Sequence, residues 1–102
     1  MHAAFDILVD KKKEKLLEKD WVKVFPNPFN NAFTIFIKAE ITGKLSTQLT
    51  DMSGRTLKTS QLDVIQGQFY TISEDNLGAI PRGVYNLRVI NGSQHRTIRL
   101  VK

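Results

Sequence analysis

Cysteine is absent from the 102-residue chain, and histidine occurs only twice, as His2 and His95. Without cysteine the chain can form no disulfide, carries no thiol nucleophile and lacks the cysteine ligands of zinc motifs. No run of apolar residues approaches the ~18 that a membrane-spanning helix needs. With 41% hydrophobic and 25% charged residues, the composition is that of an ordinary globular protein, and the length fits one domain.

The N-terminal residues also lack the order of segments found in a secretory signal peptide. A short apolar stretch, interrupted by Asp6, precedes the lysines instead of following them. We therefore expect that an exported form of this domain is a piece of a longer protein, whose signal peptide lies outside these residues.

Positive charge exceeds negative charge, since 15 Lys and Arg against 10 Asp and Glu give a net charge of +5. Residues 1–23 hold six Lys and five acids, net +1, and residues 24–102 hold nine basic and five acidic groups, net +4. The basic residues of the second part are scattered singly, apart from Arg96, Arg99 and Lys102. Because nucleic-acid binding needs a basic patch or stripe, this scatter argues against a nucleic-acid partner.

The composition changes sharply near residue 21. Residues 10–20 contain nine charged residues out of eleven, and their only apolar members are Leu16 and Leu17. Such a segment has no apolar stripe to bury, which predicts a linker or the tail of an upstream cargo protein over residues 1–21. The alternative is a helix that docks through Phe5, Leu8, Leu16 and Trp21.

From Trp21 onward, apolar and polar residues alternate with the period of a β-strand. Seven short strands are expected at 22–24, 33–38, 45–50, 55–60, 69–72, 84–89 and 96–101. Turn signals separate them, among them Thr42-Gly43-Lys44, Asp51-Met52-Ser53-Gly54 and Asn91-Gly92, where both residues tolerate positive φ. The count and spacing predict an all-β domain over residues 22–102, a seven-stranded antiparallel immunoglobulin-like β-sandwich.

Residues that could carry catalysis are few. His95 stands beside a hairpin turn, with nothing to indicate a Ser-His-Asp relay. Of the carboxylates, Asp51 is explained by its turn and Glu74-Asp75 by a polar loop. The sequence has no phosphate-binding glycine loop and no metal-ligand spacing. We therefore expect no enzymatic activity, no cofactor and no metal.

The aromatic residues mostly fall on strand-periodic positions, which favours core or edge packing over a base-stacking platform. They are Phe25, Phe29, Phe33, Phe36, Phe69, Tyr70 and Tyr85. Asn91-Gly92-Ser93 matches the glycosylation sequon, although its place in a hairpin is sufficient reason for this tripeptide.

Four local patterns remain, and they follow one another in a fixed order. Residues 24–29 read VFPNPF, residues 49–57 read LTDMSGRTL, residues 81–89 read PRGVYNLRV, and residues 96–102 read RTIRLVK. In this order they resemble the C-terminal sorting domain (type A) of proteins exported by the type IX (Por) secretion system of Bacteroidetes-type bacteria. That family opens with Tyr/Phe-Pro-Asn-Pro, continues with Asp-x-x-Gly-Arg and a Gly-x-Tyr strand, and ends on a basic-apolar strand. The resemblance covers about residues 22–102, with Thr50 in place of a common aromatic and a somewhat long loop over residues 73–81.

The resemblance implies an address label and not a catalyst. Such a domain is fused behind a secreted cargo, is recognised by the outer-membrane translocation machinery, and is usually removed by a sortase-like peptidase. The cargo would then be secreted or held at the cell surface after passage through the periplasm. Cleavage is expected in the charged stretch before Trp21, where an exposed backbone is accessible. The alternative is a generic immunoglobulin-like accessory or adhesion module of an extracellular protein.

The motif residues are the candidates for recognition, or for the fold that recognition requires. They are Pro26, Asn27, Pro28, Asp51, Gly54, Arg55, Gly83, Tyr85, Arg96, Ile98, Arg99, Leu100, Val101 and Lys102. The last strand is also expected at a sheet edge, where its unpaired N–H and C=O groups are open to a partner strand or to a second copy. Arg96, Arg99 and Lys102 would add a positive rim that favours an acidic receptor surface.

Overall fold

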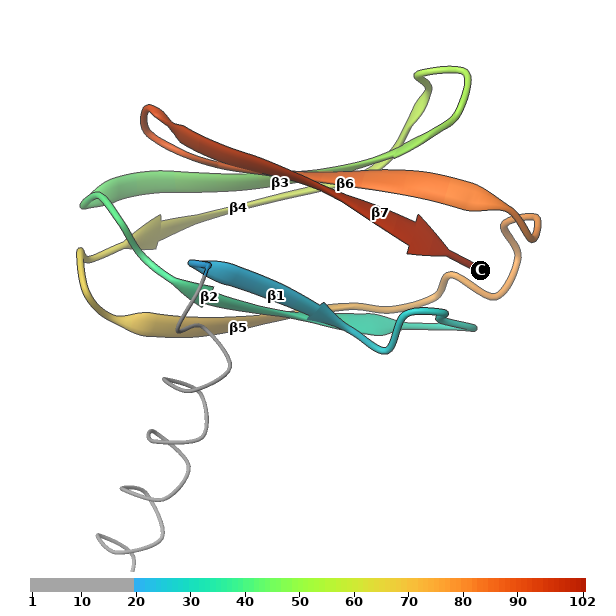
Figure 1. The fold of residues 1–102 in the computed structure, drawn as a ribbon, viewed down its shortest axis with the longest axis horizontal. Coiled ribbons are helices and arrows are strands. Elements are labelled where there is room, and N and C mark those ends of the chain that lie inside the picture. The colour runs from blue at the N-terminus through green and yellow to red at the C-terminus, as the bar shows by residue number, and fades with distance from the viewer. Residues whose placement is uncertain (1–19) are drawn as a thin grey trace, which may run out of the picture.

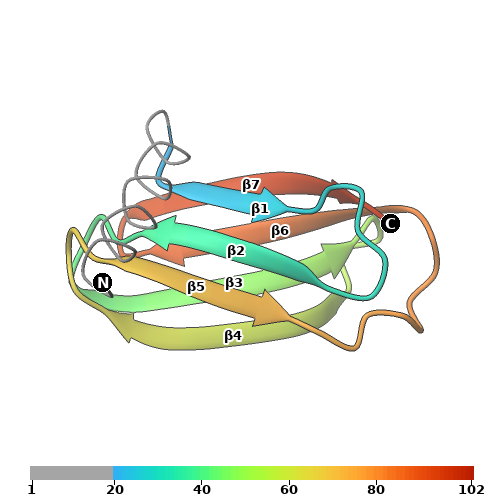
Figure 2. The same ribbon diagram turned by 90° about the horizontal axis from the view of Figure 1, so that it is seen from below.

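The computed structural model describes residues 20–102, which form two antiparallel β-sheets stacked face to face (Figure 1, Figure 2). The first sheet has the order β1-β2-β5 and the second the order β4-β3-β6-β7. The strands are β1 (Val22–Phe25), β2 (Phe33–Lys38), β3 (Gly43–Asp51), β4 (Thr56–Val64), β5 (Phe69–Glu74), β6 (Val84–Asn91) and β7 (Gln94–Val101). Residues 20–102 contain no helix. The prediction of seven antiparallel strands in an all-β fold is confirmed, whereas the immunoglobulin-like class stays a prediction.

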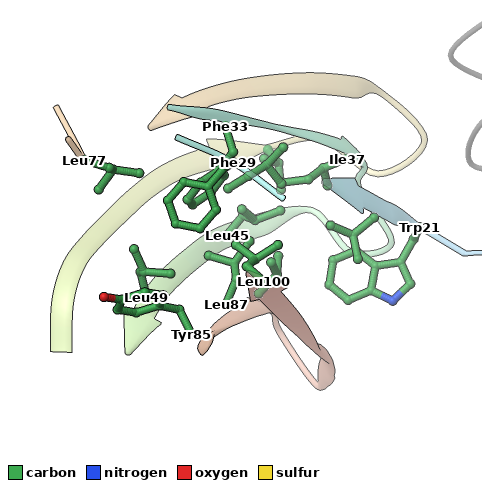
Figure 3. Close-up of a cluster of buried hydrophobic side chains, with 14 of the residues drawn as sticks. Trp21, Phe29, Phe33, Ile37, Leu45, Leu49, Leu77, Tyr85, Leu87 and Leu100 are labelled. Carbon is green, nitrogen blue, oxygen red and sulfur yellow. The ribbon is translucent and has the colours of Figure 1, made fainter. Parts of the chain in front are cut away.

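The core lies between the two sheets, because alternate residues of each strand point inward. Ile37 of β2 faces Leu45 of β3 and Leu87 of β6 across this space (Figure 3), and each is at most 1% exposed. Loop residues complete the core, with Phe29 and Leu77 buried at one end and Trp21 at the other (Figure 3). Burial of a large apolar side chain contributes roughly 1.5–3 kcal/mol, so this layer is the main source of stability.

The aromatic residues divide between the core and the outer surface. Phe29 packs edge-on against Phe33 and Tyr85 inside the sandwich, with ring centroids 5.3 and 6.2 Å away. Phe25 instead lies on the outer face of the three-stranded sheet, where it is 40% exposed and packs edge-on against Phe36. The expected core packing is therefore confirmed for Phe29, Phe33 and Tyr85, whereas Phe25 and Phe36 form a pair on an outer face.

Most of the predicted strands are longer in the structure, and two of the differences matter for packing. The strand expected at 55–60 continues to Val64, because Leu62 and Val64 turn toward the core although Gln61 and Asp63 are polar. Glu74, expected in a loop, ends β5 and is 7% exposed, with one carboxylate oxygen accepting a 2.6 Å hydrogen bond from the Ser60 hydroxyl of β4. This bond ties the second sheet to the first.

The β6–β7 hairpin is confirmed, but its turn is shifted by one residue. Asn91 is the last residue of β6 and pairs with Gln94, so that Gly92 and Ser93 form the turn. Only Gly92 has positive φ, at 61°, which fits glycine at the first central position of a type II′ turn. Asn91 therefore occupies a strand position, and not the turn position that the Asn-Gly pair predicted.

Strand directions place the ends of the fold at opposite poles. The connections after β1, β3 and β5 lie at the same pole as the end of β7 (right in Figure 1 and Figure 2). Trp21 and the β6–β7 turn lie at the other pole, and the body measures 44 × 30 × 22 Å. Residues 1–19, with Phe5, Leu8 and Leu16 of the proposed docking helix and the expected cleavage stretch, fall outside the described residues.

Trp21 is fixed where the chain enters the fold. It is 5% exposed, and its backbone oxygen accepts a hydrogen bond from the Lys38 N–H at 2.9 Å. One oxygen of Asp20 accepts from the Trp21 N–H at 2.8 Å and from Arg96 Nε at 2.9 Å. The Arg96 guanidinium also lies 5.9 Å from the centre of the indole ring. The entry point of the chain is therefore held against β7.

The side chain of Asn91 is fully buried and holds the β2–β3 connection. Its Oδ1 accepts from the N–H groups of Glu40 and Ile41 at 2.8 and 2.9 Å. Its Nδ2 donates to the carbonyl groups of Ile41 and Lys44 at 3.0 and 3.2 Å. All four hydrogen-bonding positions of the amide are thus occupied, which leaves the sequon asparagine committed to the fold.

Replacing Asn91 by alanine should destabilise the domain strongly. Asn91→Ala leaves buried backbone groups without partners, each of which costs about 1–3 kcal/mol, so we expect a loss of roughly 3 kcal/mol or more. Urea denaturation followed by circular dichroism measures the loss. Asn86→Ala is the matched control, because the half-buried Asn86 side chain makes no hydrogen bond within residues 20–102. An equal loss in both variants would contradict this role.

Candidate functional site

The four sequence motifs converge at one end of the sandwich. Residues 26–29, 51–55, 81–85 and 100–102 all lie at the pole where β7 ends (Figure 1), and we call this set the motif pole. Strand pairing brings them together, because Asp51 is opposite Tyr85 and Tyr85 is opposite Leu100. Segments as far apart in sequence as Pro26 and Lys102 thus belong to one surface, whereas Arg96 of the fourth motif lies at the other pole against Asp20.

The first motif runs along the outer edge of β7. The Asn27 side chain makes hydrogen bonds there that a neighbouring strand would otherwise make. Its Nδ2 donates to the Arg99 oxygen at 2.9 Å, and its Oδ1 accepts from the Val101 N–H at 3.0 Å. The Phe29 N–H then donates to the Val101 oxygen at 2.9 Å. Pro26 and Pro28, both preceded by cis peptide bonds, flank Asn27 and end β1 as predicted. The segment therefore covers the terminal part of an edge strand.

The third and fourth motifs close on each other. Gly83 and Lys102 exchange both backbone hydrogen bonds, at 3.1 and 2.9 Å. The Lys102 ammonium donates to the carbonyl oxygens of Gly78 and Ile80, at 3.0 and 2.6 Å. The Tyr85 hydroxyl donates to the Pro81 oxygen four residues upstream. The loop before β6 is consequently held by the last residue of the described fold.

The second motif is a turn built around Asp51. Its Oδ1 accepts from the N–H and hydroxyl of Ser53, at 3.0 and 2.7 Å, and from the Arg55 N–H at 2.9 Å. Its Oδ2 accepts from Arg55 Nε at 3.2 Å. Gly54 has φ +89°, a conformation that other residues seldom adopt. The Asp-x-x-Gly-Arg pattern is therefore explained by what this turn requires.

The hydrogen bonds of Asp51 favour its charged form. The Ser53 hydroxyl first, and then the Arg55 N–H, lower the pKa of this carboxyl below its ordinary value. Partial burial acts in the opposite direction but is outweighed. The turn is therefore most stable when Asp51 is ionised.

The three basic residues of the last strand do not share a face. Arg96 and Lys102 lie on the same side of β7 as buried Leu100, where Arg96 contacts Asp20 and Lys102 contacts the 78–80 carbonyls. Arg99 and Val101 alternate with them and point to the outer face, with Val101 41% exposed. The Arg99 guanidinium has no ion pair or hydrogen bond within residues 20–102. Ile98 lies half-buried against the core.

Sequence reasoning missed two residues of the motif pole. Asn31 binds the loop after β5, accepting from the Gly78 N–H through its side chain and from the Leu77 N–H through its carbonyl, at 2.9 and 2.8 Å. Met52, at the tip of the Asp51 turn, is 65% exposed. An exposed methionine in a tight turn could have been noticed, whereas nothing local distinguishes Asn31 from its neighbour Asn30.

Other kinds of site were also considered for the described residues. Between residues 20 and 102, no three His, Asp or Glu side chains come together as a group that could hold a metal ion. In the same stretch no helix has the length and hydropathy of a membrane span. His95 lies exposed in β7, opposite Ile90.

Substituting Asp51 should change how stability depends on pH. The lowered pKa means that ionised Asp51 stabilises the fold above the ordinary carboxyl pKa and that this contribution disappears as pH falls through the lowered value. We expect Asp51→Asn to be less stable than the parent at pH 7, with the difference shrinking toward pH 3. Urea denaturation at both pH values measures it, and Asp63→Asn, at an exposed surface ion pair, is the control. A difference independent of pH would refute the assignment.

The contact between Asn27 and β7 can be tested separately. Asn27→Ala removes two hydrogen bonds to the edge of β7, and we expect a loss of about 1–2 kcal/mol in the free energy of unfolding. The Val101 N–H should also exchange faster with solvent, since its acceptor is removed. Exposed Asn30 has no side-chain hydrogen bond within residues 20–102, so Asn30→Ala should change neither quantity. Unchanged exchange at Val101 in Asn27→Ala would contradict the proposed contact.

The comparison with protein families gives one match, and the comparison with curated proteins gives none. Residues 23–102 match the family described as the secretion system C-terminal sorting domain, a span that holds all four motifs and six of the seven strands in full. Members of this family are typically non-catalytic sorting signals for cargo that is secreted or carried to the cell surface. The chain therefore belongs to the family of type IX secretion C-terminal sorting domains.

Proposed function

We propose that residues 22–102 direct a fused cargo protein across the outer membrane, are recognised at the motif pole by the translocation machinery, and are then removed by a sortase-like peptidase. The observation that carries the proposal is the convergence of the motifs at one pole, while the chain enters the fold at Trp21 at the opposite pole. A receptor at the motif pole would meet no cargo there. Residues 1–21 would be the linker or the cargo's tail.

The chemistry of the motif pole supports recognition without catalysis. Asp51 is committed to its turn by four hydrogen bonds, and Tyr85 donates its hydroxyl to a backbone oxygen. Exposed side chains at or beside this pole include the basic Arg55, Arg82 and Arg99 and the apolar Met52 and Val101. Arginine and methionine are enriched in protein interfaces. We infer an acidic, partly apolar receptor surface.

The immunoglobulin-like class is part of the proposal. Tyr85 stands near the start of β6, after the crossover from β5, and its hydroxyl bonds to the backbone four residues upstream, as in the tyrosine corner of immunoglobulin-like domains. The arrangement differs from the constant-type domain in that β4 pairs with β3 and not with the strands of the first sheet. Other members of the sandwich architecture also depart from that topology.

Charge reversal on the exposed pole tests recognition without disturbing the fold. A signal peptide and a reporter are fused before residues 20–102 and expressed in a host with a type IX system. We expect Arg99→Glu to reduce surface delivery about tenfold, which corresponds to ~1.4 kcal/mol of lost receptor binding. Protease accessibility of the reporter on intact cells measures delivery, with periplasmic retention as the complementary readout.

Arg88→Glu is the matched control for this experiment. Arg88 is also exposed on the outer face of the second sheet and also has no side-chain partner within residues 20–102, but it pairs with Thr97, two residues further from the motif pole than Arg99. Its variant should be delivered normally. Equal delivery of the parent and Arg99→Glu would remove Arg99 from the proposed surface. Equal delivery after deletion of residues 98–102 would favour the accessory or adhesion module instead.

A further inference from the structure

The two long sides of the sandwich differ in how their edge strands are protected. On one side lie β1 and β7, and the edge of β7 is covered by residues 27–29 at the motif pole. At the other pole the Asp20 carboxylate holds Arg96 of β7. On the opposite side lie β4 and β5 (Figure 2), which no further segment of residues 20–102 pairs with. β1 is also an edge strand but has only four residues, so the longer open edges lie on this second side.

The orientation of the backbone groups on β4 follows from the ladder. In antiparallel pairs, alternate residues bond to one neighbour and those between them point away. The doubly bonded pair of Gly83 and Lys102 fixes this alternation in β7 and β6, and the continuous register carries it through β3 into β4. The β4 residues whose backbone N–H and C=O groups point away from β3 are Thr59, Gln61 and Asp63. All three residues are exposed. Within residues 20–102 their N–H and C=O groups have no partner.

A bulge limits the regular part of this edge. The register between β3 and β4 shifts at Leu49 and Thr50, and Leu57 is the extra residue of β4, packed against the core. The bulge breaks the ladder on that side, as bulges at sheet edges do. The uninterrupted edge therefore runs from Lys58 to Val64, seven residues with Gln61 at their midpoint. A two-fold axis at Gln61 would pair all seven of these residues with those of a second copy.

We propose that two copies of the domain pair antiparallel through β4, with the two-fold axis at Gln61, and join their four-stranded sheets into one of eight strands. In this register Gln61 stands opposite the partner's Gln61, and Thr59 stands opposite the partner's Asp63. The hydroxyl of threonine can donate to the carboxylate, and no like charges oppose each other. Asp63 is already paired with Lys44 at 3.2 Å, so the two copies do not confront each other with unpaired acid groups.

The edge of β5 fits a second copy less well. The β5 residues whose backbone groups point away from β2 are Phe69, Thr71 and Ser73. β5 is also shorter than β4, with six residues against nine. A two-fold axis at Thr71 would set Phe69 opposite the partner's Ser73, which gives neither a hydrogen bond nor apolar contact of matched size. Of these two longer open edges, β4 is thus the self-complementary one.

Crosslinking can test the register directly, because the chain has no cysteine. We expect Gln61→Cys to be joined into a covalent dimer by a short bis-maleimide, and Thr71→Cys, the β5 control, to stay monomeric. Thr59→Cys should link only when mixed with Asp63→Cys, since two copies of residue 59 lie about 14 Å apart along the strands. A crosslink through Thr71→Cys alone, or through neither edge, would overturn the proposal.

Sedimentation of the unmodified domain, residues 20–102, provides the second arm. The small interface should give a dimer fraction that rises between about 10 μM and about 1 mM. Gln61→Pro removes an outward N–H that the fold does not use, a position where edge strands tolerate proline, so we expect a folded variant whose dimerisation is at least tenfold weaker. Its urea midpoint verifies folding. A parent that stays monomeric, or a folded Gln61→Pro that dimerises equally, would contradict the pairing.

Discussion

Three hydrogen bonds between residues 27–29 and the edge of β7 connect the two sheets at the motif pole. They matter because β1 and β2 belong to one sheet and β7 to the other, so the contact fixes how the sheets lie on each other. The same segment places Phe29 in the core against Tyr85. With β7 held in this way, Lys102 can close the loop before β6. The first, third and fourth motifs therefore depend on one another.

Several motif residues serve the shape of this pole through contacts within the fold. Asp51 and Gly54 satisfy the demands of a turn, Asn27 substitutes for a missing strand, and Tyr85 is 4% exposed. A sequence signature in this family thus describes a surface indirectly, through the backbone arrangement that the signature requires. We propose that the receptor contacts are made by exposed side chains within the motifs, such as Arg99 and Met52.

The strands and the turn chemistry could be predicted from local patterns, since alternation and Asp-x-x-Gly have local causes. The second half of β4 could not, because Gln61 and Asp63 look like loop residues until β3 is known to lie beside them. The hydrogen bonds between the Asn27 side chain and β7 join residues 72 or more positions apart, and no local sequence pattern indicates them. The predicted positive rim does not form one surface. Arg96 and Arg99 are an odd number of residues apart, so their side chains lie on opposite faces of the strand.

The entry of the chain at Trp21 and the end of β7 lie at opposite poles of the sandwich (Figure 1). A domain built in this way acts as a rigid handle. A cargo protein attached before Trp21 would not contact a receptor that binds the motif pole. The same receptor contact could then be made with cargo of any size. A peptidase could also cleave before Trp21 while the receptor remains bound.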